Sequence, residues 1–320
     1  MTPLSSPHPH PHPDPAAVLL PNGNNSNNNQ NQNHNHTTAT TTTTRTTEIQ
    51  PEHQQPEKII EYEADPSIPP LSAVAANLHD RVQAFLAETH RAPNSLLARV
   101  QQQTRTALDV ISTALSRYKL SELSLSYNGG KDCLVLLILF LASLHPLDEK
   151  KDGISSIPAI YALPPHPFPS VEEFVRRSSR QYHLELTRYT TEPPRTTLRS
   201  AFASYLALNP SIRAIFVGTR RTDPHGAKLT HFDRTDHGWP DFVRIHPVID
   251  WRYAEIWAFI RHLGVEYCSL YDEGYTSLGG TNDTHPNPKL RVDNPEDAGG
   301  RQYRPAYELT EDDEERLGRD

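Results

Sequence analysis

Residues 126–133 read SYNGGKDC and bring two glycines, a lysine and an aspartate into one short segment. An apolar run, Leu123–Ser126, comes before it and a longer one, Leu134–Leu144, follows. Glycines let backbone N–H groups turn toward an anion, and the first turn of a following helix adds its positive end. The segment therefore predicts a phosphate site between a strand and a helix. It is not a Walker A loop, because the G-x-x-x-x-G-K-[ST] spacing is absent.

An ordinary strand-to-helix turn would explain the two glycines equally well. It would give no reason for Ser126, Asn128, Lys131 and Asp132 to crowd the same turn. An aspartate beside bare phosphate would be repelled, so its presence makes sense with a cation between the two. The alternative for Asp132 is a charge that complements the helix N-terminus.

Two later segments also carry residues suited to a site. Arg220 and Arg221 directly follow a predicted strand, so their side chains point in opposite directions and we expect one of them to reach a ligand. Asp223 precedes a proline, and its alternative role is that of a turn residue. Trp239 lies in a polar loop, an unusual place for core packing, and its indole would stack on a planar ring. Trp257 falls within an amphipathic helix and is predicted to be core.

Alternating strands and helices must position these residues. The predicted strands are Glu122–Tyr127, Ile157–Leu163, Leu184–Thr190 and Ile212–Gly218, with Phe242–Ile249 extended. The predicted helices are Leu71–Glu88, Asn94–Tyr118 with Asn94 as N-cap, Asp132–Leu144, Ser170–Tyr182 with a Ser170/Glu173 capping box, Thr197–Leu208, and Arg252–Gly264 closed by Gly264. Residues 219–241 read as a long polar loop. The pattern predicts a doubly wound α/β fold with a mainly parallel sheet, whose ligands lie at the carboxyl ends of the strands.

Composition divides the chain into two parts. Residues 1–70 are rich in His, Pro, Asn, Gln and Thr, and they contain too few apolar side chains to offset the entropy of ordering. We expect a disordered tail there and a single domain over residues 71–320. The HPHPHP repeat at the start has a composition that can bind metal, but a metal role is not expected of it.

Charge and cysteine usage exclude several classes of protein. The net charge is −8 and no dense Lys/Arg run occurs, so we expect neither a nucleic-acid nor a membrane-surface partner. Cys133 and Cys268 are the two cysteines of the chain, too few for a disulfide framework or a four-cysteine zinc site. The longest apolar run is too short to span a bilayer, and the N-terminus lacks a signal-peptide pattern. We therefore predict a cytoplasmic location and a monomer.

The glycine segment resembles the pyrophosphate-binding loop of the adenine-nucleotide α-hydrolase-like superfamily, in the branch that includes PAPS reductase. Within that branch, the form Ser-x-Asn-Gly-Gly-Lys-Asp-Cys resembles eukaryotic, fungal-type FAD synthases (FMN adenylyltransferases). Four further stretches resemble the same family in the same order: FVGTRRTDP (216–224), RTDHGWPDFVRIHPVIDW (234–251), YCSLYDEGYTSLGGTNDTHPNP (267–288) and YRPAYELTEDDEERLGR (303–319). The resemblance covers residues 122–319 and implies a Rossmann-like PP-loop ATP pyrophosphatase fold with N-terminal helices and a C-terminal arm.

The resemblance implies the last step of FAD biosynthesis, in which ATP and FMN give FAD and pyrophosphate with the help of Mg²⁺. The implied catalytic residues are Asn128, Asp132, Asp223, Asp236 and Arg316; the implied binding residues are Ser126, Gly129, Gly130, Lys131, Arg220, Arg221, Trp239 and Arg319; and Mg²⁺ would lie at Asp132 and Asn128. Gly129, Gly130 and Lys131 would hold the β and γ phosphates. Trp239 would contact the flavin. By composition Arg316 and Arg319 belong to a solvated acidic tail, whereas the family's matching arginines reach back to the phosphates.

Two other functions remain open at this point. A sulfonucleotide (PAPS/APS) reductase shares this loop, but it needs a reactive cysteine on a C-terminal arm and no cysteine follows Cys268. A catalytically silent nucleotide- or flavin-binding module would keep the fold and lose the phosphate-handling residues, whereas Lys131, Asp132 and Arg316 are all present. Cys133 stands where related loops carry serine, and we expect it to be a small buried contact rather than a nucleophile.

Overall fold

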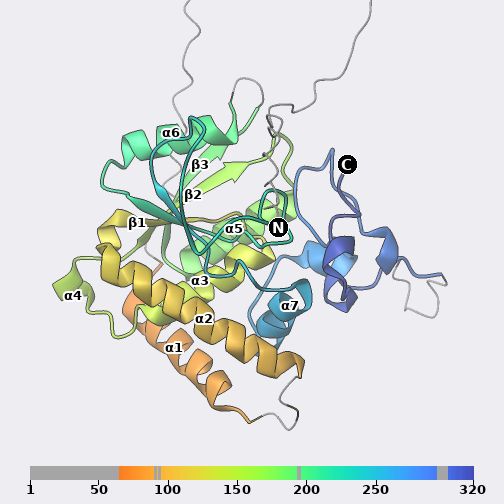
Figure 1. Ribbon diagram of the computed structural model, residues 1–320, viewed down its shortest axis with the longest axis horizontal. Coiled ribbons are helices and arrows are strands. Elements are labelled where there is room, and N and C mark those ends of the chain that lie inside the picture. The colour runs from red at the N-terminus through yellow and green to blue at the C-terminus, as the bar shows by residue number, and fades with distance from the viewer. Residues whose placement is uncertain (1–64, 90–91, 93–94, 193–195, 294–301) are drawn as a thin grey trace, which may run out of the picture. The chain divides into compact units, whose positions relative to one another are not determined.

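The sheet of the protein is mainly parallel, as the sequence predicts. A computed structural model describes residues 65–89, 92, 95–192, 196–293 and 302–320 (Figure 1). Its six strands are β1 Leu123–Ser126, β2 Ile157–Leu163, β3 Leu184–Thr190, β4 Ala214–Val217, β5 Phe232–Arg234 and β6 Val243–Ile245. They lie in the order β3-β2-β1-β4-β6-β5. All neighbouring strands pair in parallel except β5 and β6, which are antiparallel.

Helices cover both faces of the sheet. The α-helices are α1 Leu71–Ala87, α2 Leu96–Arg117, α3 Lys131–Ser143, α4 Glu149–Asp152, α5 Pro169–Gln181, α6 Leu198–Leu208 and α7 Tyr253–His262. Short 3₁₀ turns are η1 Leu120–Glu122, η2 Ser269–Glu273, η3 Pro288–Leu290, η4 Ala306–Glu308 and η5 Asp312–Glu314. Figure 1 shows α1 and α2 on one side of the sheet and α6 on the opposite side. The larger buried cluster joins α1, α2, α3, α5 and α7 to the sheet, and a smaller one joins α6 to the other face.

Helix α3 is the central helix of the larger core. Every residue from Cys133 to Ala142 is buried, because the sheet lies on one side of the helix and α1, α2 and α7 pack around the other. Helix α1 presents Leu71, Leu78 and Val82 on one face at helical spacing, as an outer helix does. The apolar run after the glycine segment is therefore a fully buried helix whose first turn carries Lys131 and Asp132 of that segment.

The structure corrects several predicted boundaries. Strand β5 lies inside the predicted loop 219–241; its sequence FDR is short and polar, so no apolar alternation marks it. Strand β6 ends at Ile245, before the predicted Ile249, because residues 247–250 form a turn that begins with a proline. Helix α5 is capped by Phe168 with a proline at its first position, so the predicted Ser170 cap is wrong.

The N-terminal predictions are tested only in part. Helix α2 has Ser95 as its N-cap, and the predicted cap Asn94 lies outside the described residues. Most of the predicted disordered tail, residues 1–64, lies outside them as well.

The predicted closure of α7 by Gly264 is confirmed, since this residue has φ +59° directly after the last turn of the helix. Within the described part of the chain, no helix combines the length and apolar character needed to cross a membrane.

Candidate active site

Two neighbouring strands bring the main predicted segments together. Ser126 at the end of β1 lies opposite Val217 at the end of β4, so the loops that follow these strands start side by side. Gly218 then passes close to the first turn of α3, where a Cβ atom on it would lie 2.7 Å from the backbone nitrogen of Cys133. Gly129 has φ +73°, a conformation that favours glycine. Both glycines are thus needed for the loop geometry.

The glycine loop is held by its own side chains and by a distant tyrosine. The Asn128 Oδ1 atom accepts hydrogen bonds from the Gly130 N–H at 3.0 Å and from the Cys133 thiol at 2.9 Å. The Lys131 N–H donates to the Tyr271 hydroxyl at 2.9 Å. Burial raises the pKa of the Cys133 thiol to about 12, so this group is not a nucleophile at neutral pH. The prediction of a small buried contact at Cys133 is confirmed.

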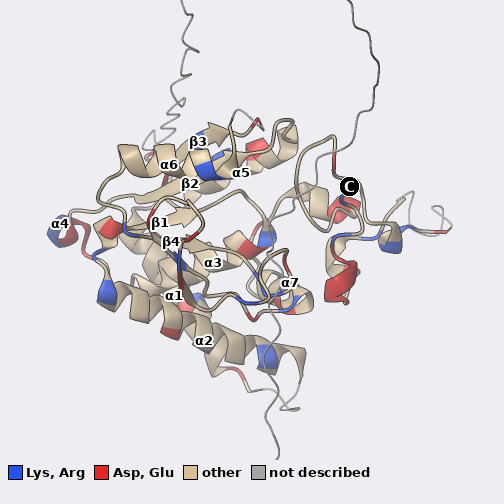
Figure 2. Ribbon diagram, turned by 45° about the horizontal axis from the view of Figure 1, so that its top comes forward, with Lys and Arg blue, Asp and Glu red and all other residues tan. Residues whose placement is uncertain are grey.

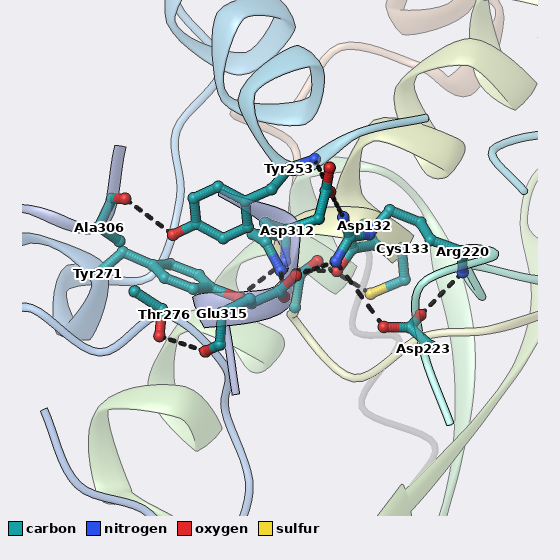
Figure 3. A network of polar contacts seen from close by, with 12 residues as sticks. Asp132, Cys133, Arg220, Asp223, Tyr253, Tyr271, Thr276, Ala306, Asp312 and Glu315 are labelled. Carbon is teal, nitrogen blue, oxygen red and sulfur yellow. Dashed lines mark hydrogen bonds and ion pairs between the residues drawn. The ribbon is translucent and has the colours of Figure 1, made fainter. Parts of the chain in front are cut away.

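A buried charge network lies behind the loop (Figure 3). We use this name for the Lys131 and Arg220 cations with the carboxylates of Asp132, Asp223, Asp312 and Glu315. Lys131 Nζ is 2.9 Å from Asp132 Oδ2 and also binds Glu315. Arg220 Nε is 2.7 Å from Asp132 Oδ1, and Arg220 Nη1 is 3.3 Å from Asp312 Oδ1. Arg220 Nη2 binds Glu315 and lies 3.7 Å from Asp223 Oδ1.

For Lys131, Asp132 and Arg220, the neighbouring opposite charges outweigh the effect of burial on the pKa. Burial lowers the pKa of Lys131, but the adjacent Asp132 and Glu315 carboxylates outweigh it, and the pKa lies above its usual value. Burial raises the pKa of Asp132, but Lys131 and Arg220 outweigh it and lower this pKa. Arg220 follows the same rule as Lys131, and its pKa is raised. The site thus holds two fixed cations and four carboxylates in a region that is largely closed to water.

The adjacent arginines Arg220 and Arg221 point to different surroundings, as predicted, although both lie in the loop after β4 rather than in the strand. Arg220 is 0% exposed and all its described partners belong to the network. Arg221 is exposed and pairs with Asp250, with its Nε 2.6 Å from the Asp250 Oδ1 atom. It also donates to the backbone carbonyls of Ala227 and Leu229. In this structure neither guanidinium is without protein partners.

The C-terminal arm, residues 303–320, contributes Asp312 and Glu315 to the network. The sequence analysis missed both, because they stand in an acidic run that reads as a solvated tail. The available signal was position: Glu315 directly precedes Arg316 in the family-like segment. Arg316 is exposed, and within the described residues its guanidinium makes no hydrogen bond or ion pair. Arg319 is mostly buried, with its Nη2 atom 3.2 Å from the Asp283 Oδ2 atom.

The predicted flavin residues lie on the β5–β6 hairpin. Asp236 has a side chain 67% exposed and sits 3.4 Å from the ring nitrogen of His237. Trp239 is 36% exposed, and its ring packs edge-on against Phe202 of α6 with centroids 5.9 Å apart. Trp257, in contrast, is buried as predicted. The described ion pairs of the hairpin loop do not include a member of the charge network.

The oxygen atoms of the loop fit a cation that is shared with a phosphate. Among the residues that the structure describes, no three His, Cys, Asp or Glu side chains are arranged to hold a metal ion by themselves. Mg²⁺ is usually bound by one or two carboxylates together with substrate phosphates, and it requires oxygen ligands. Asp132 supplies a carboxylate at the loop, still 19% exposed. The Asn128 amide oxygen accepts two hydrogen bonds within the loop, and the two Asp132 oxygens face Lys131 and Arg220, so either predicted ligand would exchange a present partner for the metal.

Comparison with known proteins gives consistent matches. Residues 122–286 match the family described as phosphoadenosine phosphosulfate reductase domain. The chain is 40% identical over 236 residues to the probable FAD synthase of Schizosaccharomyces pombe, across 72% of this chain and 84% of that protein. The crystal structure of Candida glabrata FMN adenylyltransferase in complex with FMN and the ATP analogue AMPCPP is 29% identical, with a TM-score of 0.71 over 79% of this chain and 98% of that one. Yeast FAD synthetase in complex with FAD is 30% identical, with a TM-score of 0.69 over 79% of this chain and 100% of that one.

Proposed function

The chain belongs to the FAD synthases of the phosphoadenosine phosphosulfate reductase domain family, and from this premise we propose how its residues transfer AMP from ATP to the phosphate of FMN. The products are FAD and pyrophosphate, and the enzyme is a nucleotidyltransferase. The observation that carries the assignment is the joining of three family-like segments, the glycine loop, the segment after β4 and the arm, through one buried charge network.

The chemistry needs charge neutralisation more than proton transfer. An oxygen of the FMN phosphate attacks the α-phosphorus of ATP, and the bond from that phosphorus to the β-phosphate oxygen breaks. A phosphate monoester has a second pKa of about 6, so the attacking oxygen is already ionised at neutral pH. The remaining difficulty is to bring two polyanions together in line, which depends on positioning and electrostatics. This agrees with a site built from glycines, lysine, arginines and carboxylates.

We assign the leaving-group side to the glycine loop and the arm. The backbone of Gly129 and Gly130, with Ser126 at the end of β1, receives the β and γ phosphates at the N-terminus of α3. Lys131 adds positive charge directly behind the loop. Arg316 has an exposed guanidinium without a partner among the described residues and is assigned to the phosphates. Arg319, three residues on, is assigned to them as well, although it pairs with Asp283 in this structure. Arg220 and Arg221 are assigned to this side as well, with Arg220 acting from within the network.

We assign the acceptor side to the hairpin loop. The half-exposed indole of Trp239 offers a face to the isoalloxazine ring, and its packing on Phe202 fixes its direction. The exposed carboxylate of Asp236 accepts hydrogen bonds from donor groups of the bound flavin. Asp223, at the turn after β4, accepts a hydrogen bond from the Arg220 backbone N–H at 2.8 Å, which fixes that turn.

Magnesium is the proposed metal, with Asp132 and Asn128 as the residues that would hold it together with the phosphates of ATP. When bound, it neutralises charge on the polyphosphate as the diphosphate departs. The carboxylates of the network outnumber its cations by two, which leaves the region receptive to an added divalent cation.

The proposal includes a cytoplasmic monomer that takes small molecules. Both cysteines are free and buried, which agrees with a reducing compartment. Figure 2 shows Lys and Arg spread over several elements and acidic residues gathered near the C-terminal end, a distribution that does not favour nucleic acid. The two buried thiols also argue against the reductase alternative, since burial raises the pKa of Cys133 and of Cys268.

One assay tests the proposal directly. Purified protein is mixed with FMN, ATP and Mg²⁺, and FAD and pyrophosphate are measured in equal amounts. Asp132→Ala and Arg316→Ala should each lower kcat by roughly 10²–10³-fold, the cost of losing one group that stabilises developing charge. Asp109→Ala, a surface change on α2, serves as the control and should leave activity intact. Turnover of adenylyl sulfates instead of FMN would contradict the proposal.

A further inference from the structure

One carboxylate of the arm contacts both cations of the charge network. Glu315 binds the Lys131 ammonium, 184 residues away in sequence, and the Arg220 guanidinium, 95 residues away. The residue is only 5% exposed. Asp312, the other arm residue in the network, reaches Arg220 but has no described contact with Lys131. Glu315 is therefore the direct ionic link, among the described contacts, between the arm and the phosphate loop (Figure 3).

The backbone around Glu315 is fixed as firmly as its side chain. The buried Thr276 hydroxyl donates to the Glu315 carbonyl at 2.6 Å. The buried Asn287 amide donates to the Glu314 carbonyl at 2.8 Å and to the Thr276 hydroxyl at 2.9 Å. A carboxylate anchored in this way is a fixed part of the folded structure. It does not behave as a mobile group that occupies the phosphate position and leaves when the nucleotide arrives.

The anchor fixes the residues that follow it. Arg316 is the next residue along the chain, and the Gly318 carbonyl accepts the His285 N–H at 2.8 Å. At Gly318 a Cβ atom would lie 2.3 Å from the His285 carbonyl oxygen, so the arm passes this strand-like segment in close contact. The position of Arg316 is thus set by a charge contact on one side and by backbone packing on the other.

We propose that Glu315 is a positioning residue for ATP, which couples docking of the C-terminal arm to the placement of Lys131 in the phosphate loop. The inference rests on the proposed function and extends it to a residue outside the nucleotide-contacting set. If Glu315 is neutralised, Lys131 keeps Asp132 as its partner, and Arg220 keeps Asp132 and Asp312. The fold can therefore persist, whereas the alignment of Lys131 with Arg316 is lost.

The test compares Glu315→Gln with Glu314→Gln in the full chain. Glu314 is the matched control: it is the neighbouring residue, with the same charge change, and it pairs with Lys289 at the surface at 2.7 Å. We expect Glu315→Gln to raise KM for ATP by about tenfold or more while KM for FMN stays within about threefold, because the flavin-side hairpin has no described tie to Glu315. Glu315→Asp, which can still reach one cation, should fall between wild type and Glu315→Gln.

A second measurement tests how firmly the C-terminal arm is docked, without relying on catalysis. Limited trypsin digestion followed by intact mass detects cleavage after Arg316, and Glu315→Gln should be cleaved several-fold faster than Glu314→Gln. Thr276→Val removes the hydroxyl that holds the Glu315 carbonyl without changing any charge, and it should also speed cleavage. It replaces Glu315→Gln in the kinetic comparison if that variant does not fold. These digestions report on the inference even if wild-type protein makes no FAD, which would contradict the proposed function alone.

Three outcomes would overturn the inference. Equal KM values for ATP in the two glutamine variants would show that the contact does no positioning. A lower KM for ATP in Glu315→Gln would show that the carboxylate competes with the phosphates. Equal rises in both KM values together with a lower Tm would show a purely structural role.

Discussion

The two halves of the site are built in opposite ways. On the leaving-group side, Lys131 and Arg220 are 2% and 0% exposed and are surrounded by carboxylates. On the acceptor side, Trp239 and Asp236 stand on a hairpin loop that is open to solvent. Charges act strongly where water is excluded, whereas a stacking ring needs an accessible face. Under the proposed assignment, the polyphosphate side is already organised by protein contacts in this structure, whereas the flavin side presents an accessible ring.

The same contrast appears between two adjacent residues. Arg220 turns inward to four carboxylates, and Arg221 turns outward to Asp250. The two arginines are neighbours in the loop after β4, which turns one side chain inward and the other outward. They therefore offer a direct measure of what burial contributes to a charged contact in this protein.

The largest predicted effect is on stability when the inward arginine is removed. Arg220→Met should lower the free energy of unfolding by about 3–5 kcal/mol, because it leaves buried carboxylates without their shared cation. Chemical denaturation followed by circular dichroism measures the change. Arg221→Met is the matched control, and its loss should be much smaller because its ion pair is exposed and screened by water.

The result of this pair decides whether the comparison holds. Equal losses for the two variants would mean that burial of Arg220 adds nothing, and that the inner network is no more organised than the surface. A loss for Arg220→Met that is rescued by lowering the pH would still support the network, because protonation of the carboxylates removes their repulsion.

A smaller effect is predicted on the acceptor side. Trp239→Ala should weaken FMN binding by about tenfold or more, since stacking of a planar ring on an aromatic side chain is worth roughly 1–3 kcal/mol. KM for ATP should remain near the wild-type value, because the indole packs on Phe202 and not on the network. Quenching of flavin fluorescence on titration of FMN gives the affinity.

The conservative variant sharpens this prediction. Trp239→Phe keeps a stacking face and should retain most of the affinity that Trp239→Ala loses. A parallel rise in KM for ATP in Trp239→Ala would remove the separation between the two sides. It would place the indole in the common part of the site.

The sequence predicts the fold and the inner loop well because their signals are local. Apolar runs of the right length mark β2 and α3, and the glycines and charged residues mark the loop between β1 and α3. The different surroundings of Arg220 and Arg221 are predicted from alternation, but β4 ends at Val217, so the loop after the strand sets their directions. Burial of Cys133 and Trp257 follows from their helical surroundings.

Long-range contacts explain what the sequence does not reveal. In the sequence, Glu315 and Asp312 are part of an acidic run that is typical of a solvent-exposed tail. Only the fold shows that Glu315 contacts Lys131, which is 184 residues away in sequence. Strand β5 has no apolar alternation because it is an edge strand of three residues, held by pairing with β6. In both cases the partner, not the residue's own segment, determines the structure.

The smallest predicted effect concerns the buried base of the exposed hairpin. His246 is 1% exposed, and its Nδ1–H donates to the Thr230 carbonyl at 2.9 Å, which ties β6 to the start of β5. Burial lowers the pKa of His246 below its ordinary value. In the unfolded chain, the pKa of histidine is about 6.5. As the pH falls, the unfolded state is therefore protonated at His246 before the folded state is. The contribution of His246 to stability is then complete above about pH 6.5 and declines below it, as the pH approaches the lowered folded-state pKa.

His246→Asn isolates this contribution, because an asparagine Nδ2 can take the place of the imidazole Nδ1 and still donate to Thr230, yet it does not titrate. Denaturation at pH 7.5 and at pH 5.5 should show a larger loss of stability for wild type than for the variant. If the two proteins lose stability equally, His246 is not the group that senses pH, and the hairpin base is no better protected from protons than the loop above it. A larger loss of stability for wild type would show that the base of the hairpin is protected from protonation, as a buried group is. The contrast between the two sides of the site would then lie in the hairpin loop alone.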